Sequence, residues 1–368
     1  MKLPSLNGLR FVSILLVVLG HLSIHYGTLR ETSVPAIAVP FVRLITDAQL
    51  GVTVFFVISG FLINTLLLKE EAHHGCISWK YFFIRRSLRI FPAYFTLLLV
   101  YFILTCFQHI YISPESWLTS LTYTKYLNWD TDWYTAHFWS LSIEEQFYLL
   151  WPLIFLAGNT TRKRITFLLI LIVPVFRVIA FYGHYSWMDD FSIFQRIDAI
   201  AIGCLIAFYY DPIVKLLQNH WRWLWWVALL SLILLHYLAE AVNAVNLWWI
   251  IVPTGTSHGT FATIAIGILL LYSLQPRKTL WFAFLNHAWV NRIGVYSYGI
   301  YLWQQLFLYH SDHWYNQLPY NLLLLAGCVL ASYHLIERPF MRLKERYQYP
   351  SSAVSLVPVV VESLPPKP

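Results

Sequence analysis

The chain has 368 residues, of which 58% are apolar, 18% are aromatic and only 12% are charged. Soluble globular proteins carry about 25% charged residues, so this chain lacks about half of the usual polar coat. The same composition excludes an intrinsically disordered protein, because disorder requires low hydrophobicity. We therefore expect an integral membrane protein, with the lipid bilayer as a partner that covers much of its surface.

Apolar runs long enough to cross a bilayer, about 20 residues each, recur along the chain. They predict an all-α, polytopic membrane helix bundle of about ten transmembrane helices, approximately at residues 8–27, 48–68, 89–109, 140–158, 165–183, 195–210, 221–239, 258–274, 293–310 and 318–337. The Trp-containing stretch 244–253 is too short to span and is expected at the membrane interface. We expect an integral membrane domain over 1–340 and a disordered cytoplasmic tail over 341–368, which ends in a proline-rich segment.

The basic residues predict the orientation of these helices. Most of the 25 Lys and Arg residues fall in the segments on the N-terminal side of the membrane, and the opposite segments hold Arg30, Arg43 and Lys125. The positive-inside rule then places both termini in the cytoplasm, most simply at a plasma or inner membrane. The net charge of +7 is thus explained by topology, and we expect no nucleic-acid partner.

Two ionisable residues lie in the first predicted span. Arg10 and His21 are about three helical turns and roughly 16 Å apart on one face, and ionisable groups inside a membrane are candidates for function. Snorkelling of Arg10 to lipid phosphates is an equally simple explanation for that residue. His25 could form an i,i+4 metal pair with His21, but no carboxylate or thiol completes the set. We therefore expect no metal and no tightly bound cofactor.

Further polar residues cluster near the ends of other spans. Arg86 and Arg89 share a helical face that could bind a phosphate-rich ligand, although on spacing alone positive-inside charge is the better explanation. Adjacent Glu144 and Glu145 point about 100° apart, so one of them can face the bundle centre. Glu144 also shares a face with Tyr148.

The order of these motifs is similar to that in the membrane acyltransferase-3 family of multi-pass O-acyltransferases. The resemblance covers residues 4–340 and rests on the segment Leu6–Arg10 followed by His21, the segment Gly51–Ile63, Arg86-x-x-Arg89 with Pro92 and Tyr94, the run Trp139–Tyr148, Arg196-x-Asp198, the run Tyr296–Trp303, and Glu337-Arg338-Pro339. It implies transfer of an acyl group, normally acetyl, from cytoplasmic acyl-CoA as co-substrate to a hydroxyl of an extracytoplasmic glycan or lipid-linked sugar.

The resemblance also implies roles for individual residues. The expected catalytic residues are His21 and Glu144, the donor-binding residues are Arg10, Arg86 and Arg89, and the supporting residues are Tyr148, Ser142, His137, Arg196, Asp198 and Glu337. The residue types suit the reaction, because a histidine titrates near neutrality and can take the proton of an attacking alcohol. A carboxylate can fix the imidazole tautomer.

Two departures from the family pattern leave other classes of function open. Thr53 stands where the family often has Asp, and Gln304 stands where it often has His. They leave open a catalytically inactive receptor or scaffold on the same fold. A transporter is a separate alternative, because polar residues on the bundle helices could line a substrate path. His184 and Asp189 fit the spacing of a glycerolipid acyltransferase motif, but they fall in a predicted outer loop, away from a cytosolic donor. The sequence does not encode the acceptor, the acyl chain length or the oligomeric state.

Overall fold

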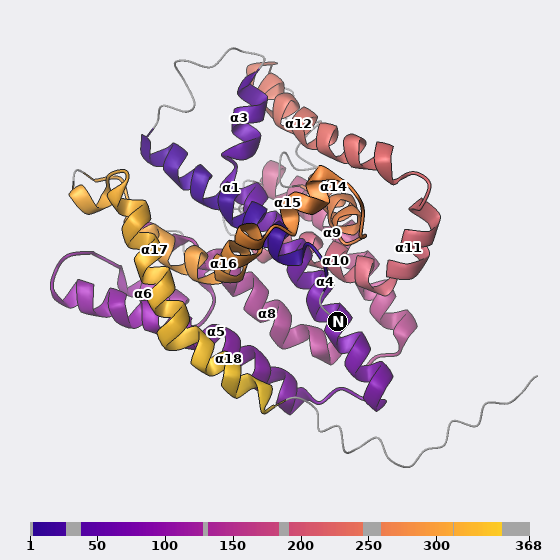
Figure 1. Ribbon diagram of the computed structural model, residues 1–368, viewed down its shortest axis with the longest axis horizontal. Coiled ribbons are helices and arrows are strands. Elements are labelled where there is room, and N and C mark those ends of the chain that lie inside the picture. The colour runs from indigo at the N-terminus through magenta and orange to yellow at the C-terminus, as the bar shows by residue number, and fades with distance from the viewer. Residues whose placement is uncertain are drawn as a thin grey trace, which may run out of the picture.

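The computed structural model describes residues 3–26, 38–127, 132–183, 191–245, 259–311 and 313–347, and these residues form helices and connecting turns without a strand (Figure 1). Each predicted span contains a helix: α1 (Leu6–Tyr26), α4 (Ala48–His74), α5 (Trp79–Cys106), α8 (Phe138–Ile154), α9 (Asn159–Gly183), α10 (Ile193–Phe208), α12 (Trp221–Val245), α14 (Thr260–Ser273), α16 (Ala288–Phe307) and α17 (Tyr320–Ser332). The predicted all-helical class is confirmed.

Several of these helices can cross a membrane by themselves. Five described helices are long and apolar enough, and there are six if α10 and α11 (Tyr210–Leu217), bent by 80°, form one broken span. Others, such as α8 with 17 residues and α14 with 14, are shorter than that measure requires. The protein is thus an integral membrane protein.

Short helices that the hydropathy pattern did not predict lie between the long ones. They are α3 (Val39–Ile45), α6 (Pro114–Leu121), α7 (Trp133–Ala136), α15 (Leu280–Leu285) and α18 (Arg338–Glu345). The start of α6 is readable in retrospect, because Ser113 caps the helix by accepting a hydrogen bond from the Ser116 amide and Pro114 occupies the first turn. His184, Asp189, residues 246–253 and the tail beyond 347 lie outside the described residues.

Helix α4 is the centre of the bundle and packs against α1, α8, α10 and α14. Its closest neighbour is α10, where Gly60 lies against the backbone of Ile200 and Gly203 lies against the backbone of Val57. A side chain at either glycine would meet backbone atoms that cannot move aside. Small residues of this kind let membrane helices approach closely and pack through van der Waals contact.

A buried amide joins three helices at the same place. Asn64 on α4 is fully buried, and its Nδ2 donates to the carbonyl of Cys204 on α10 at 2.9 Å. Its Oδ1 accepts from Trp151 Nε1 on α8 at 3.2 Å. Polar side chains hydrogen-bonded between helices stabilise membrane bundles, so this contact fixes α8 relative to α4 and α10.

Helix α1 is held between α4 and α16 by further close contacts. Gly294 on α16 lies against the backbone of Asn7, and Gly51 on α4 lies against the backbone of Ser13. The Ser13 hydroxyl donates to the Gly51 carbonyl. These contacts set which face of α1 lines the cavity that it shares with α4, α5, α8 and α16.

Replacing Gly203 by alanine should destabilise the protein by about 1–3 kcal/mol, as expected for overpacking, because the new methyl group would press on the α4 backbone. The measurement is the thermal unfolding temperature of the purified protein in detergent. Gly327→Ala on α17 is the matched control, since a side chain there meets open space and alanine favours a helix. Equal unfolding temperatures for the two variants would contradict the close α4–α10 contact.

Candidate active site

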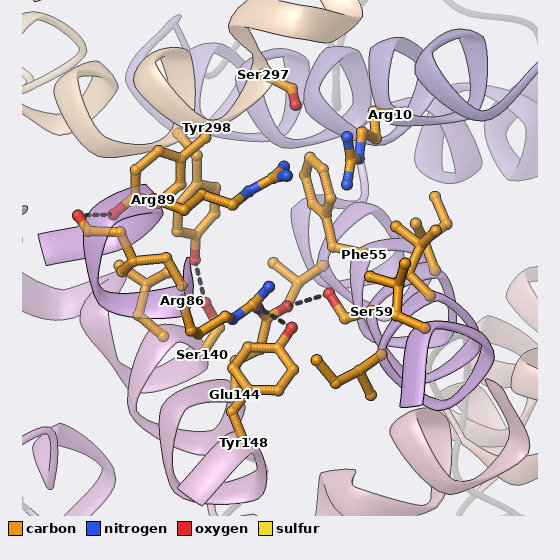
Figure 2. Close-up of a pocket in the computed structure, with 18 residues that line it drawn as sticks. Arg10, Phe55, Ser59, Arg86, Arg89, Ser140, Glu144, Tyr148, Ser297 and Tyr298 are labelled. Atoms are coloured by element: carbon orange, nitrogen blue, oxygen red, sulfur yellow. Dashed lines mark hydrogen bonds between the residues drawn. The ribbon is translucent and has the colours of Figure 1, made fainter. Parts of the chain in front are cut away.

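A cavity of about 130 Å³ lies between α1, α4, α5, α8 and α16 (Figure 2). One wall is apolar and comes from α4. The polar lining consists of Arg10, Ser59, Arg86, Arg89, Ser140, Glu144, Tyr148, Ser297, Tyr298 and Tyr301. We call this space the inner cavity.

Three arginines dominate the inner cavity. Figure 2 shows the guanidinium groups of Arg10 from α1 and of Arg86 and Arg89 from α5 converging on the same space. Arg86 lies over the ring of Tyr148, 3.4 Å from its centroid. In the part of the chain that the structure describes, none of the three forms a salt bridge. Because isolated charges are costly in a low-dielectric interior, this arrangement favours binding of an anion.

Glu144 is the carboxylate that lines the inner cavity together with these arginines. Its two oxygens accept hydrogen bonds from Ser59 on α4 at 3.0 Å and from Tyr148, one turn along α8, at 3.2 Å. Its charge interacts with those of Arg86 and Arg10 without a direct ion pair. The predicted shared face of Glu144 and Tyr148 is therefore present, and the charge of Glu144 partly offsets the positive charge in the cavity.

His21 lies in a different cavity, of about 250 Å³, which we call the outer cavity. Its Nδ1 is 2.9 Å from the carbonyl of Val17, and since a carbonyl can only accept, Nδ1 carries the proton. Nε2 of the neutral ring then keeps its lone pair, as a general base requires. Trp133 meets the ring edge-on at 5.7 Å between centroids.

The two cavities meet at shared side chains. Val52 on α4 and Tyr301 on α16 line both of them. The Tyr301 hydroxyl is 2.6 Å from Ser140 Oγ and donates to the carbonyl of His137 at 2.9 Å. These bonds hold the tyrosine ring in place, so Val52 and Tyr301 form a partition between the arginines and His21.

Glu144 and His21 are consequently separated. The hydrogen bonds of Glu144 go to Ser59 and Tyr148, while the Nδ1 hydrogen bond of His21 goes to Val17. The structure therefore does not bring Glu144 to His21 as the carboxylate that orients the imidazole.

The two departures from the family pattern lie close to His21 or on the neighbouring helix. Thr53 is buried, and its hydroxyl donates to the Gln49 carbonyl of its own helix at 2.8 Å. Gln304 is fully buried and its amide interacts with His21, but neither amide atom reaches hydrogen-bond geometry with another described residue. Gln304 is thus a second polar neighbour of His21, in addition to the Val17 carbonyl.

Two of the predicted supporting residues belong to the wall of the outer cavity. His137 lines it, and its Nδ1 is bound to Oε1 of Gln305. Arg196 on α10 donates to the side-chain oxygen of Gln49 and lies 5.5 Å from the ring of Trp139. Both of these partners line the cavity, so Arg196 supports the wall from behind.

The remaining supporting residues make structural contacts. Asp198 accepts from Arg177 on α9 at 3.0 Å and from Thr260 on α14 at 2.6 Å, which joins three helices. The hydroxyl of Ser142 donates to the carbonyl of Phe138 on its own helix. Glu337 lies against Gly299 of α16. The geometry supports a packing role for Asp198 and Ser142, whereas Glu337 also interacts electrostatically with Arg89.

A buried ion pair that the sequence did not predict lies at the outer cavity. Lys125 is fully buried, lines the cavity, and donates from Nζ to Ser116 Oγ at 2.7 Å and to Asp132 at 3.3 Å. Burial opposes the charge of Asp132, but hydrogen bonds from Thr135 and Ser116 and the charge of Lys125 outweigh it and lower the pKa of Asp132. The pair ties α6 and α7 together at the mouth of the cavity.

Comparison with known proteins agrees with this geometry. The chain is 29% identical over 412 residues to a Staphylococcus aureus (strain MRSA252) protein provisionally named as an O-acetyltransferase, covering 99% of this chain and 62% of that protein. It is 26% identical over 369 residues to the O-acetyltransferase OatA of S. aureus (strain NCTC 8325 / PS 47), covering 92% of this chain and 57% of OatA. The chain thus spans about three-fifths of the length of these relatives, and no solved structure matches it. The family model described as an acyltransferase domain matches residues 3–335, so the chain belongs to the acyltransferase-3 family.

Proposed function

We propose that the protein transfers an acyl group, acetyl in the first instance, from cytoplasmic acyl-CoA to a hydroxyl of an extracytoplasmic glycan or lipid-linked sugar. The observation that carries the proposal is the pair of adjoining cavities, one with three converging arginines and the other with a histidine whose Nε2 is free to accept a proton. The relatives' names support an O-acetyl transfer.

The proposed topology has ten spans, with both termini in the cytoplasm. A helix in each predicted range supports it, as does the excess of basic residues on one side. The arginines of the inner cavity then lie toward the cytoplasm and the outer cavity opens to the other side. We infer a plasma or inner membrane location, because the donor is cytosolic and the acceptor is outside the cell.

Arg10, Arg86 and Arg89 are the proposed donor-binding residues. A guanidinium group is planar and binds phosphate oxygens in pairs, and CoA carries a diphosphate next to its pantetheine arm. Among the described residues, Glu144 offsets the charge of these arginines only in part. The negative charge of the phosphates would offset the rest. Glu144 then has the role of setting the charge and geometry of the donor site.

His21 is the proposed general base. Its Nε2 takes the proton of the acceptor hydroxyl while the hydroxyl oxygen bonds to the carbonyl carbon of the thioester. The carbon–sulfur bond breaks, the electron pair leaves on sulfur, and the thiolate takes the proton from Nε2. A neutral imidazole held by Val17 in this tautomer is suited to both proton transfers.

The outer cavity is the proposed acceptor site. Its walls hold the aromatic rings of Trp133, Trp139 and Tyr126 together with the polar side chains of Gln49 and Gln305. Aromatic faces and hydrogen-bonding groups in one concave site suit a ligand with apolar ring faces and hydroxyl groups, which is the chemistry of a sugar.

The experiment that tests the proposed function is release of CoA thiol from acetyl-CoA by the purified protein in lipid nanodiscs. His21→Ala should lower the rate by about 10²–10⁴-fold, the usual contribution of a general base. His109→Ala is the matched control, because His109 is exposed beyond the end of α5. Normal turnover by the His21 variant would refute the mechanism, and no thiol release by the wild type would favour a transporter or scaffold.

Glu144→Gln should reduce turnover by about tenfold or more, because it removes the negative charge beside Arg86 and weakens two hydrogen bonds of a charged group. Glu145→Gln is the matched comparison, since Glu145 is adjacent but does not line the inner cavity. Initial rates at matched expression decide the point. A larger defect in the Glu145 variant would reverse the assignment.

Tyr301→Ala should increase the hydrolysis of acetyl-CoA in the absence of an acceptor several-fold, because the two cavities would merge and admit water to the thioester. Tyr301→Phe keeps the ring and loses the hydroxyl bonds to Ser140 and His137, so its effect should be smaller. Thiol release is followed without acceptor. The partition would be disproved if the alanine variant hydrolysed acetyl-CoA no faster than the wild type.

A further inference from the structure

A third cavity, of about 350 Å³, continues the inner cavity toward the proposed cytoplasmic side. The two share the side chains of Ile63, Leu66, Arg86 and Arg89. The remaining lining residues come from the C-terminal end of α4, the N-terminal end of α5 and α18, and they are Leu67, Lys69, Glu70, His73, His74, Phe82, Arg85 and Lys344. A ligand held by Arg86 and Arg89 can therefore extend from one cavity into the other.

The charges in this third cavity are unevenly paired. Arg85 donates to Glu70 at 2.6 Å, and Glu70 also accepts from the backbone amide of Ser78. The carboxylate of Glu70 is thus already occupied. Among the residues that the structure describes, Lys69 and Lys344 have no carboxylate partner, so they present two further positive charges beside Arg86 and Arg89.

Lys344 reaches this cavity because of how the chain enters α18. The segment Tyr333–Glu337 forms a π-helical turn, and α18 then packs against α5. One extra residue in a turn rotates all following side chains by about 100°. In the resulting orientation Lys344 lies partly buried and within electrostatic reach of Arg85, Arg86, Arg89 and Arg10.

The third cavity thus holds four cations that have no carboxylate partner among the described residues, which are Arg86, Arg89, Lys69 and Lys344. Like charges at one place are unfavourable unless an anion with several charges binds among them. CoA carries its phosphates at two positions, the diphosphate and the 3′-phosphate of the ribose, with adenine beyond. If the thioester points toward His21 and the diphosphate meets Arg86 and Arg89, the adenosine end falls in the third cavity. Its apolar lining by Phe82, Leu66 and Leu67 suits an adenine ring.

We propose that the third cavity binds the adenosine 3′-phosphate end of the donor, with Lys344 and Lys69 contacting the 3′-phosphate. The proposal rests on the proposed function, because it assumes that acyl-CoA is the donor. It assigns specificity to these two lysines, which would distinguish CoA from thioesters that lack the nucleotide phosphate.

The test compares two donors that differ in one group, acetyl-CoA and acetyl-3′-dephospho-CoA, in the thiol-release assay with the full chain in nanodiscs. For the wild type, the KM of the dephospho donor should be at least about tenfold higher, as expected for a lost charge-assisted hydrogen bond. Lys344→Met should raise the KM of acetyl-CoA by about tenfold and that of the dephospho donor by less than about twofold. Removing the 3′-phosphate from the donor and removing the ammonium group of Lys344 would then abolish the same contact.

Arg342→Met is the matched control, because Arg342 is an exposed cation on the same helix that does not line the cavity. It should leave the preference for acetyl-CoA intact. Lys69→Met gives an independent second variant with the same expected direction, and Lys344→Arg should retain the preference.

A wild type that uses both donors equally would overturn the inference, as would a Lys344 variant in which both KM values rise together, because the lysine would then act through the general field or bind lipid phosphate. A wild type that releases no thiol from either donor would instead overturn the proposed function.

Discussion

Positive charge held inside a helix bundle is the constraint on which the site depends. Three guanidinium groups from α1 and α5 share one cavity whose lining includes the carboxylate of Glu144. Such a cluster is tolerated only where the surrounding helices are fixed firmly enough to prevent the side chains from separating. The glycine contact of α4 with α10 and the two hydrogen bonds by which Asn64 joins α4, α8 and α10 supply that rigidity. Packing at a distance from the arginines therefore keeps the three guanidinium groups close together.

The same packing arranges the cavities in series. Residues of α4 line all three, because this helix passes from the third cavity, at Leu67, through the inner cavity to the outer one, at Gln49. Helix α1 packs beside α4 and carries Arg10 toward one end and His21 toward the other. A reaction between substrates from opposite sides needs this geometry, in which each substrate has its own entrance and the reacting atoms meet between them.

Much of the fold follows from the sequence, because an apolar run of sufficient length has few structures available in lipid other than a helix. The face shared by Glu144 and Tyr148 is equally local, since it depends on helix periodicity alone. The separation of Glu144 from His21 is different: it depends on Tyr301, on another helix, being placed between them. The position of Lys344 in the third cavity could not be predicted from the sequence either, because a single π-helical turn decides which face of α18 meets α5.

The partition of Val52 and Tyr301 has a consequence for the size of the group that is passed on. Both side chains are about nine-tenths buried or more, and the tyrosine is tethered at its hydroxyl. In the proposed reaction, an acetyl group would pass this boundary with a small rotation of the ring, whereas a long acyl chain would have to break the tether and displace the valine. The boundary would then limit the length of the acyl group, and the accepted chain length should follow the bulk of these two side chains.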